Sequence, residues 1–334
     1  DLNAFTAEIT GKNSSKLDFA PIFQKSKLVL DISGKSVNTT VVNTLRRLSM
    51  DYVPTYAFPP ESITIEKNTS VFNNDMMRNR LSQLTIPNIA NEIYFLEDKF
   101  WKGINFANPN RDKHPDDKKV LEFYLNATNN TNDIMNVNTG HAKVYEDGIE
   151  LKDVFDKNYS DLIIQLRPKE VFSCKCVGIL SIGKNNNIWA ASGNTYYDDI
   201  NDNKFEFTVE SQRQMKEYEI LIKSCKILKE KIKLIKKTVS DKYDKPEITN
   251  GSALKIILEN EDHTLGNIIN ECLQTNKNVL YSVMSKPDLL VDNMVIKFTT
   301  AKKNPLIPLF ESLDYITKLY NKIETLLEAL SKKK

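Results

Sequence analysis

The sequence has little of what a secreted or membrane-spanning protein needs. Its 334 residues include four cysteines, which are Cys174, Cys176, Cys225 and Cys272. They are too few and too scattered for a disulfide framework, so a reducing compartment is indicated. No apolar run reaches the roughly 18 residues that span a bilayer, and no signal peptide is visible. We therefore expect an intracellular protein without membrane contact.

An excess of charge of one sign is also missing. The chain carries 46 Lys and Arg against 44 Asp and Glu, a formal net charge of +2. A protein that binds phosphate backbones directly usually has a larger basic excess. Hydrophobic residues make up 40% of the chain and charged residues 27%, as in ordinary soluble globular proteins. The charge balance therefore predicts protein partners first and gives no support for direct nucleic-acid binding.

Assembled catalytic or metal-binding motifs do not occur in the sequence. No glycine-rich phosphate loop is present, and His114, His141 and His263 stand alone rather than in a recognisable catalytic or zinc motif. Cys174 and Cys176 have the most metal-like spacing, because residues i and i+2 share one face of a strand. No neighbouring Cys or His completes four ligands, so packing in a sheet is the favoured interpretation. We expect no catalytic residues, no metal and no cofactor.

Two segments of the chain begin with a short strand that leads into a helix. The first strand is expected at 27–32 and its helix at about 40–52, where the apolar positions recur on one face. The second strand is expected at 254–258, with a helix from about Thr264. Between the two, residues 60–202 show short strand signals broken by polar loops, of which the asparagine-rich stretch 126–138 is expected to be largely loop.

Each segment is also associated with one long helix that has an apolar seam. The helices are expected at about 215–239 and 305–330, and their apolar residues step by three or four positions throughout. Two units that each expose such a seam bury it most simply against each other. The residues predicted to form this internal dimerisation surface are Leu221, Leu228, Ile232, Ile235, Leu313, Ile316, Tyr320 and Ile323.

The two strand-to-helix junctions also resemble each other in sequence. When Asn43 is set against Asn267, 40–45 faces 264–269. The first copy continues with Arg46 and Arg47, whereas the second has Asn270 and Glu271. Arginine forks suit carboxylate-rich interfaces, although a solvated helix face explains the same pair. Both interpretations stay open on the residues alone.

These junctions resemble a known family. Residues 261–267, Glu-Asp-His-Thr-Leu-Gly-Asn, match the hallmark of the eleventh subunit of eukaryotic RNA polymerase II and of its archaeal L-type counterpart. Residues 43–47, Asn-Thr-Leu-Arg-Arg, followed by Val-Pro-Thr at 53–55, resemble the third subunit, its archaeal D-type counterpart and the bacterial alpha subunit. Further segments around 68–71, 80–87 and 205–211 fit the same family. The resemblance therefore covers nearly the whole chain.

The resemblance implies a fold. It is an α+β pseudo-dimer of two strand-helix-strand dimerisation units with long packed helices, plus an inserted mostly-β domain. The implied third-subunit-like unit comprises 17–60 and 203–243, the insert 61–202, the linker 244–251 and the eleventh-subunit-like unit 252–330. Fusion of the two subunits is known among large DNA viruses that encode their own polymerase, and the heavy Asn and Lys usage fits a low-GC genome of that kind.

The resemblance also implies a function. The chain would be a non-catalytic scaffold of a heteromeric DNA-directed RNA polymerase, located in cytoplasmic virus factories and virions. Its implied partners are the largest and second-largest subunits and a small tenth-type subunit, and DNA would be contacted only indirectly through the complex. The residues expected to bind partners are Asn43, Arg46, Arg47, Glu261, Asp262 and His263.

Two departures from the family and one alternative function bear on these expectations. The cysteine cluster that many third-type subunits carry in the insert is missing, because residues 88–119 hold no cysteine. The Pro-His-Pro of eleventh-type subunits is also incomplete at 286–289. A helical adaptor outside transcription would explain the seams but not the motif at 261–267.

Overall fold

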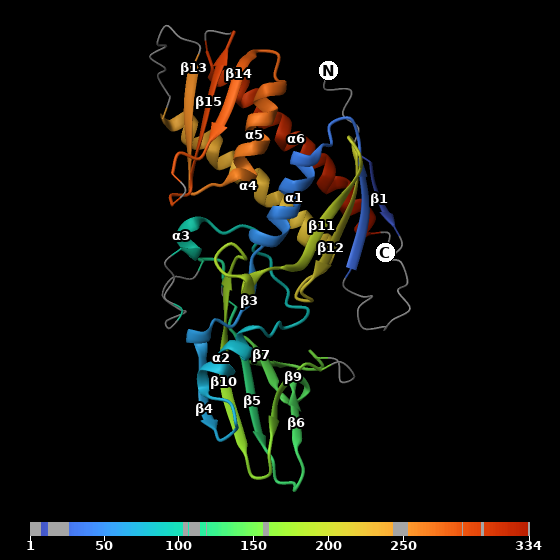
Figure 1. Ribbon diagram of the computed structural model, residues 1–334, viewed down its shortest axis with the longest axis vertical. Helices are drawn as coiled ribbons and strands as arrows, with labels where there is room; N and C mark the ends of the chain where they lie inside the picture. Colours follow the sequence, from blue (N-terminus) through green and yellow to red (C-terminus); the bar gives the residue numbers. More distant parts are fainter. Residues whose placement is uncertain are drawn as a thin grey trace.

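The computed structural model describes residues 8–12, 27–102, 106, 114–117, 119–155, 160–242, 253–288, 290–301 and 304–332. The molecule is elongated. One sheet with its helices lies at one end, a second sheet lies beside crossed helices in the middle, and a mostly-β region forms the other end (Figure 1). None of the described helices is long and apolar enough to cross a membrane.

The first unit is built around a four-stranded antiparallel sheet. Its strand order is β1-β2-β12-β11, formed by β1 (Glu8–Lys12), β2 (Lys27–Ser33), β12 (Lys204–Ser211) and β11 (Ser192–Asn201). Strand β2 alternates half-buried and buried residues, and α1 (Thr39–Asp51) packs against β11. Strand β11 lies inside the range 61–202 that was expected for the insert, yet it pairs with β12 along its length.

The second unit repeats this plan with a smaller sheet. Its order is β13-β15-β14, formed by β13 (Ala253–Glu259), β15 (Asn293–Thr300) and β14 (Val279–Ser285). Helix α5 (His263–Thr275) packs against β14 and β15, as α1 packs against β11. The chain order of strand, helix and two further strands therefore recurs in the two units.

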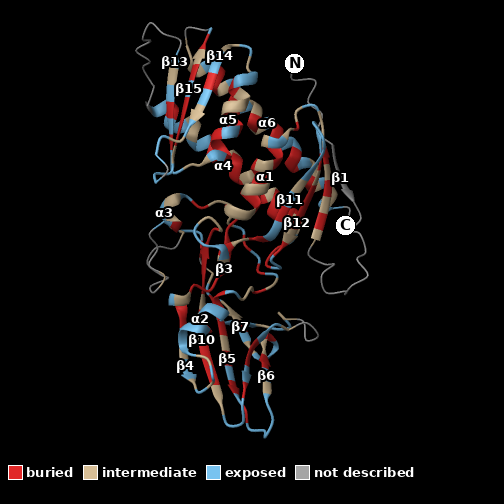
Figure 2. Cartoon of the chain, in the orientation of Figure 1, coloured by how far each residue is buried: buried red, intermediate tan, exposed pale blue. Residues whose placement is uncertain are grey.

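Two long helices of equal length join the units. Helix α4 (Glu217–Lys242) and helix α6 (Leu306–Ser331) pack against each other. Lys229 donates to Asn321 at 2.9 Å, while Lys236 pairs with Asp314 further along α4. Rising numbers on α4 thus meet falling numbers on α6, so the helices cross antiparallel. Their facing sides are buried where they cross (Figure 2).

All eight residues predicted for the internal dimerisation surface lie on these helices. Ile235 is half-buried and packs against the core, and the others are at most 1% exposed. The two units are also hydrogen-bonded through the core, because the Tyr320 hydroxyl donates to the Val41 carbonyl at 2.8 Å. One apolar cluster runs through both units and into the insert.

The inserted region is built on a sheet, with short helices in the connections between strands. The path β3-β10-β5-β7-β8 uses β3 (Thr55–Ala57), β10 (Val171–Ser181), β5 (Leu121–Thr128), β7 (Lys143–Glu146) and β8 (Ile149–Leu151), and β4 (Ile63–Asn68) also pairs with β10. Strands β6 (Met135–Asn138) and β9 (Leu162–Leu166) form a separate pair. Short helices are α2 (Asn74–Ser82), α3 (Asp98–Trp101), η2 (Pro60–Ser62), η3 (Thr139–His141) and η4 (Asn187–Trp189).

The expected fold class, an α+β pseudo-dimer with a mostly-β insert, is confirmed. One local expectation was wrong, because the stretch 126–138 is loop only between β5 and β6. Asn126 and Ala127 pair with β10, where the ladder satisfies their backbone groups. The expected linker 244–251 and residues 17–26 of the expected first unit lie outside the described residues.

Candidate partner-binding site and the joint between the units

Helices α1 and α5 each begin at a side-chain cap, and these caps place the candidate residues. The Asn38 side chain accepts from the backbone N–H of Val41 at 3.0 Å. The Asp262 side chain accepts from the backbone N–H of Thr264 at 2.8 Å. Such caps satisfy backbone donors that a helix start leaves unpaired. Asn38 and Asp262 are equivalent positions when Asn43 is set against Asn267.

Each cap also receives a side chain from the helix of the other unit. Arg47 on α1 donates from Nη2 to Asp262 Oδ2 at 3.3 Å and from Nε to the Thr264 hydroxyl at 2.8 Å. In the reverse direction, the side-chain amide of Asn38 donates to the Glu271 carboxylate on α5. Arg47 and Glu271 are equivalent positions as well. We call this set of contacts, Arg47 with Asp262 and Thr264 and Asn38 with Glu271, the joint between the units. Its two halves are related by the pseudo-symmetry of the units, and the cation Arg47 faces the acidic cap Asp262.

The Arg47 guanidinium lies between two carboxylates. It reaches Asp51 Oδ2 at 3.2 Å in addition to Asp262, and its side chain stays 39% exposed. Burial raises the pKa of Asp51, against the charge of Arg47. Burial also acts on Asp262, but hydrogen bonds from Thr264 and nearby cations outweigh it, so the pKa of Asp262 lies below its usual value. Asp262 therefore remains an anion that holds Arg47 in place.

A buried ion pair lies next to this joint. Lys231 on α4 contacts Glu261 with Nζ 2.5 Å from Oε1, and the side chains are 9% and 16% exposed. The same ammonium lies 4.4 Å from the centroid of the Tyr52 ring, a cation–π distance. Burial raises the pKa of Glu261, against the charge of Lys231. The pair links the long helix of the first unit to the motif of the second.

The insert also reaches this joint. Lys184 donates to the Asn260 carbonyl at 3.3 Å, and Lys102 donates to the Asn260 side-chain oxygen at 2.5 Å. Asn260 has a φ of 61°, which asparagine adopts more readily than most residues. The Lys184 ammonium also lies 5.4 Å from the Tyr52 ring centroid. The turn before α5 is thus the meeting point of both units and the insert.

The other three candidate residues, Asn43, Arg46 and His263, make no side-chain hydrogen bond or ion pair across the joint with the described residues. Arg46 donates from Nε to the Asn43 side chain at 3.0 Å and contacts the Met50 sulfur, both within α1. His263, the first residue of α5, is exposed, and so is Asn267 one turn later. The structure therefore divides the expected set. Arg47, Glu261 and Asp262 bind across the joint, while Asn43, Arg46 and His263 lie at its surface.

Sequence reasoning missed the partners that complete the joint. Asn38 and Glu271 could have been found, because the alignment of the two copies places them opposite Asp262 and Arg47. Lys231 carried only a weak signal, a lysine between the seam residues Leu228 and Ile232. Nothing local indicated Lys184 or Tyr52, because their contacts join distant parts of the chain.

The cysteines are expected to be inert in the folded protein. Burial raises the pKa of Cys225 well above its usual value and that of Cys272 to about 12. A thiol with a pKa of about 12 forms roughly a thousandfold less thiolate at pH 8 than a free cysteine does. We expect slow labelling by iodoacetamide in buffer at pH 8 and rapid labelling of all four cysteines in urea. Fast labelling of Cys225 in the native protein would contradict its burial.

The described residues contain no group of three or more His, Cys, Asp or Glu side chains that could hold a metal ion. Cys174 and Cys176 are both buried on β10. They lie in the ladder between β4 and β5. Their surroundings are those of packed core residues.

Comparison with known proteins identifies two related domains in this chain. Residues 31–232 and residues 253–326 match two families that are both described as the RNA polymerase Rpb3/Rpb11 dimerisation domain. A protein of Acanthamoeba polyphaga mimivirus, named as a DNA-directed RNA polymerase subunit, is 27% identical over 346 aligned residues. The alignment covers 96% of this chain and 95% of that protein.

Proposed function

Because the chain belongs to the family of RNA polymerase subunits with Rpb3/Rpb11 dimerisation domains, we propose that it is the assembly platform on which the two largest subunits dock. The expected resemblance to a fused alpha-like subunit of a viral DNA-directed RNA polymerase is confirmed by the two domains and the mimivirus relative. The chain itself would be non-catalytic, and the active site would belong to its partners.

The observation that carries this proposal is the closed interface between the two dimerisation units. Helices α4 and α6 bury their seams against each other, and Arg47, Asp262, Asn38 and Glu271 join the two helix starts. The two Rpb3/Rpb11 dimerisation domains therefore pair with each other within one chain. A preassembled platform presents two related but unequal outer surfaces, which suits two different large partners.

We assign the second-largest subunit to the surface around α1. Asn43, Arg46 and the exposed part of Arg47 would contact it, because arginine forks bind carboxylates of a partner well. Glu261 and Asp262 would position the start of α5, and the exposed His263 would contact a partner directly. The domain limits given above belong to the same proposal, except that β11 is part of the sheet of the first unit. A tenth-type partner and a location in virus factories and virions belong to it as well.

Arg46→Glu is the cleanest test of this surface. Arg46 makes its described contacts only within α1, so its reversal is expected to change the unfolding free energy by less than about 1 kcal/mol. The recovery of the second-largest subunit with the tagged chain should fall at least about tenfold, as the loss of an arginine hot spot would produce. Quantitative mass spectrometry after affinity purification measures the ratio.

Arg167→Glu is the matched control. Arg167 is exposed in the turn between β9 and β10, and these strands belong to the inserted region, away from α1 (Figure 1). Its reversal should therefore leave co-purification unchanged. Equal recovery of the large subunits with Arg46→Glu and wild type would remove the site assignment. Absence of both large subunits even with the wild-type chain would remove the proposed function and favour an adaptor outside transcription.

A further inference from the structure

The sheets of the two units are equivalent, but in the described part of the chain only β2, and not its counterpart in the second unit, has a strand paired along each edge. Strands β2, β12 and β11 of the first unit correspond to β13, β15 and β14 of the second, in the same spatial order. In the first unit, β1 pairs antiparallel with the outer edge of β2. Among the described residues, no strand pairs with the outer edge of β13. An open strand edge presents unpaired backbone donors and acceptors.

The outward side chains of β2 are also less exposed than those of its counterpart β13. Both alternate, with inward residues buried or nearly so. The outward residues of β2 are half-buried, whereas Lys255, Ile257 and Glu259 of β13 are exposed, Ile257 by 45%. The first unit therefore shows this edge covered by a strand, and the second unit shows it without a paired strand among the described residues.

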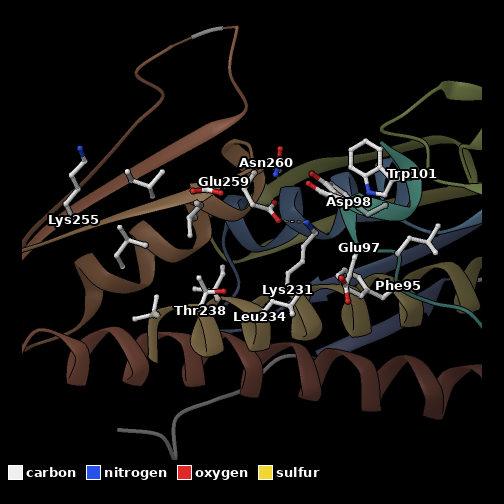
Figure 3. A pocket seen from close by; sticks show the side chains of 18 residues that line it. Phe95, Glu97, Asp98, Trp101, Lys231, Leu234, Thr238, Lys255, Glu259 and Asn260 are labelled. Carbon is white, nitrogen blue, oxygen red and sulfur yellow. Dashed lines mark hydrogen bonds and ion pairs between the residues drawn. The ribbon is translucent and has the colours of Figure 1, made fainter. Parts of the chain in front are cut away.

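A groove of about 410 Å³ lies along the bare edge. One wall is β13 and the other is α4, which contributes Leu234, Ile235, Thr238 and Val239; Leu234 is 40% exposed. In the first unit, β1 lies beside α6, and α6 is the counterpart of α4. The groove thus occupies the position that β1 has in the other unit. Figure 3 shows side chains of both walls facing the space between them.

Carboxylates gather at one end of the groove, and most of them already face a lysine. Glu97 and Asp98 at the start of α3 line it together with Glu259 at the end of β13. Glu97 and Asp98 have lysine partners, at 2.9 and 3.4 Å. Of the lining ammonium groups, Lys231 is already paired with Glu261. A basic side chain of an incoming segment would add to these contacts.

We propose that an extended segment of a neighbouring polymerase subunit adds to the edge of β13 as an antiparallel strand. Its backbone would pair with β13, its alternate apolar side chains would enter the groove beside Leu234, and a Lys or Arg would reach Glu259. The inference rests on the proposed function, because it takes the partner from the same polymerase. The occupant is the counterpart of β1, supplied by another chain.

Site-specific photo-cross-linking in the assembled polymerase tests this proposal. Ile257 is replaced by p-benzoylphenylalanine, and the same replacement at Leu280 serves as control, because Leu280 is 69% exposed on β14 at the other edge of the sheet. We expect position 257 to cross-link to another polymerase subunit several-fold more efficiently than position 280. No preference, or cross-links only within this chain or to a second copy of it, would overturn the proposal.

A groove variant separates this inference from the proposed function. Leu234→Arg fills the groove with a charged side chain at a partly exposed position, so the fold should persist while the cross-link from position 257 falls several-fold. A cross-link that persists unchanged would overturn the groove assignment. If the wild-type chain brings down the large subunits but position 257 captures nothing, only the strand-addition inference fails.

Discussion

Replacing Ile232 with alanine is expected to lower the free energy of unfolding by about 2–5 kcal/mol, as for other large-to-small changes in packed cores. Ile232 is 1% exposed on α4. It lies in sequence between Lys229 and Lys236, which bind the facing residues of α6, so it belongs to the crossing of the two long helices. Removing its side chain leaves a cavity where the two units share their core.

Leu234→Ala is the matched control for this change. It removes a similar side chain from the same helix at a position that is 40% exposed, so the expected loss is below about 1 kcal/mol. Urea denaturation followed by circular dichroism gives both values. Equal losses, or a separate unfolding step for the second unit that Ile232→Ala leaves unchanged, would contradict a shared core.

Replacing Glu261 with alanine is expected to cost about 3–5 kcal/mol, because it leaves the Lys231 ammonium buried without its anion. The two side chains are only 9% and 16% exposed, and the neighbouring Tyr52 ring does not replace a carboxylate. The loss would be measured by the same urea titration. We expect the double change Lys231→Met with Glu261→Leu to recover most of the stability, because it removes both charges.

An exposed ion pair between the same two units provides the control. Lys236 and Asp314 join α4 and α6 with side chains that are 28% and 57% exposed. Lys236→Ala should therefore cost no more than about 1 kcal/mol. If Glu261→Ala proved as mild as Lys236→Ala, the Lys231–Glu261 pair would not hold the motif in place.

The long elements of the fold could be predicted from sequence because their signals are local. The apolar steps through Leu228 and Ile232 and through Ile316 and Tyr320 place α4 and α6 within three residues of their observed ends. Asn38 and Pro305 mark the starts of their helices. Packing of the seams follows from the hydrophobic effect, since two amphipathic faces in one chain have few other ways to leave water.

The joint could not be predicted in the same way. The motif at 261–267 indicated a partner surface, but Glu261 and Asp262 are held by Lys231 and Arg47 from the other unit. These contacts depend on how the units sit against each other, which no local pattern encodes. Strand β11 could not be assigned to the first unit for a related reason. Its exposed face is polar, and only its pairing with β12 places it in that sheet.

Fusion gives the pairing of the two units a further physical advantage. Two separate chains would have to associate before a platform existed. In linked units, the effective concentration of one unit around the other is of about millimolar order. The unequal members of the joint, Arg47 facing Asp262 and Glu271 facing Asn38, also distinguish the two units. A second copy of the later unit would instead place Glu271 against Asp262, which like charges disfavour.

Native mass spectrometry of the polymerase purified through this chain can determine whether one polypeptide supplies the whole platform. If one polypeptide supplies the whole platform, the complex should contain one copy of it for each copy of the largest and second-largest subunits. No separate third-type or eleventh-type chain should be present. Two copies of this chain, or an additional eleventh-type subunit in the complex, would show that one copy of this chain is not the whole platform.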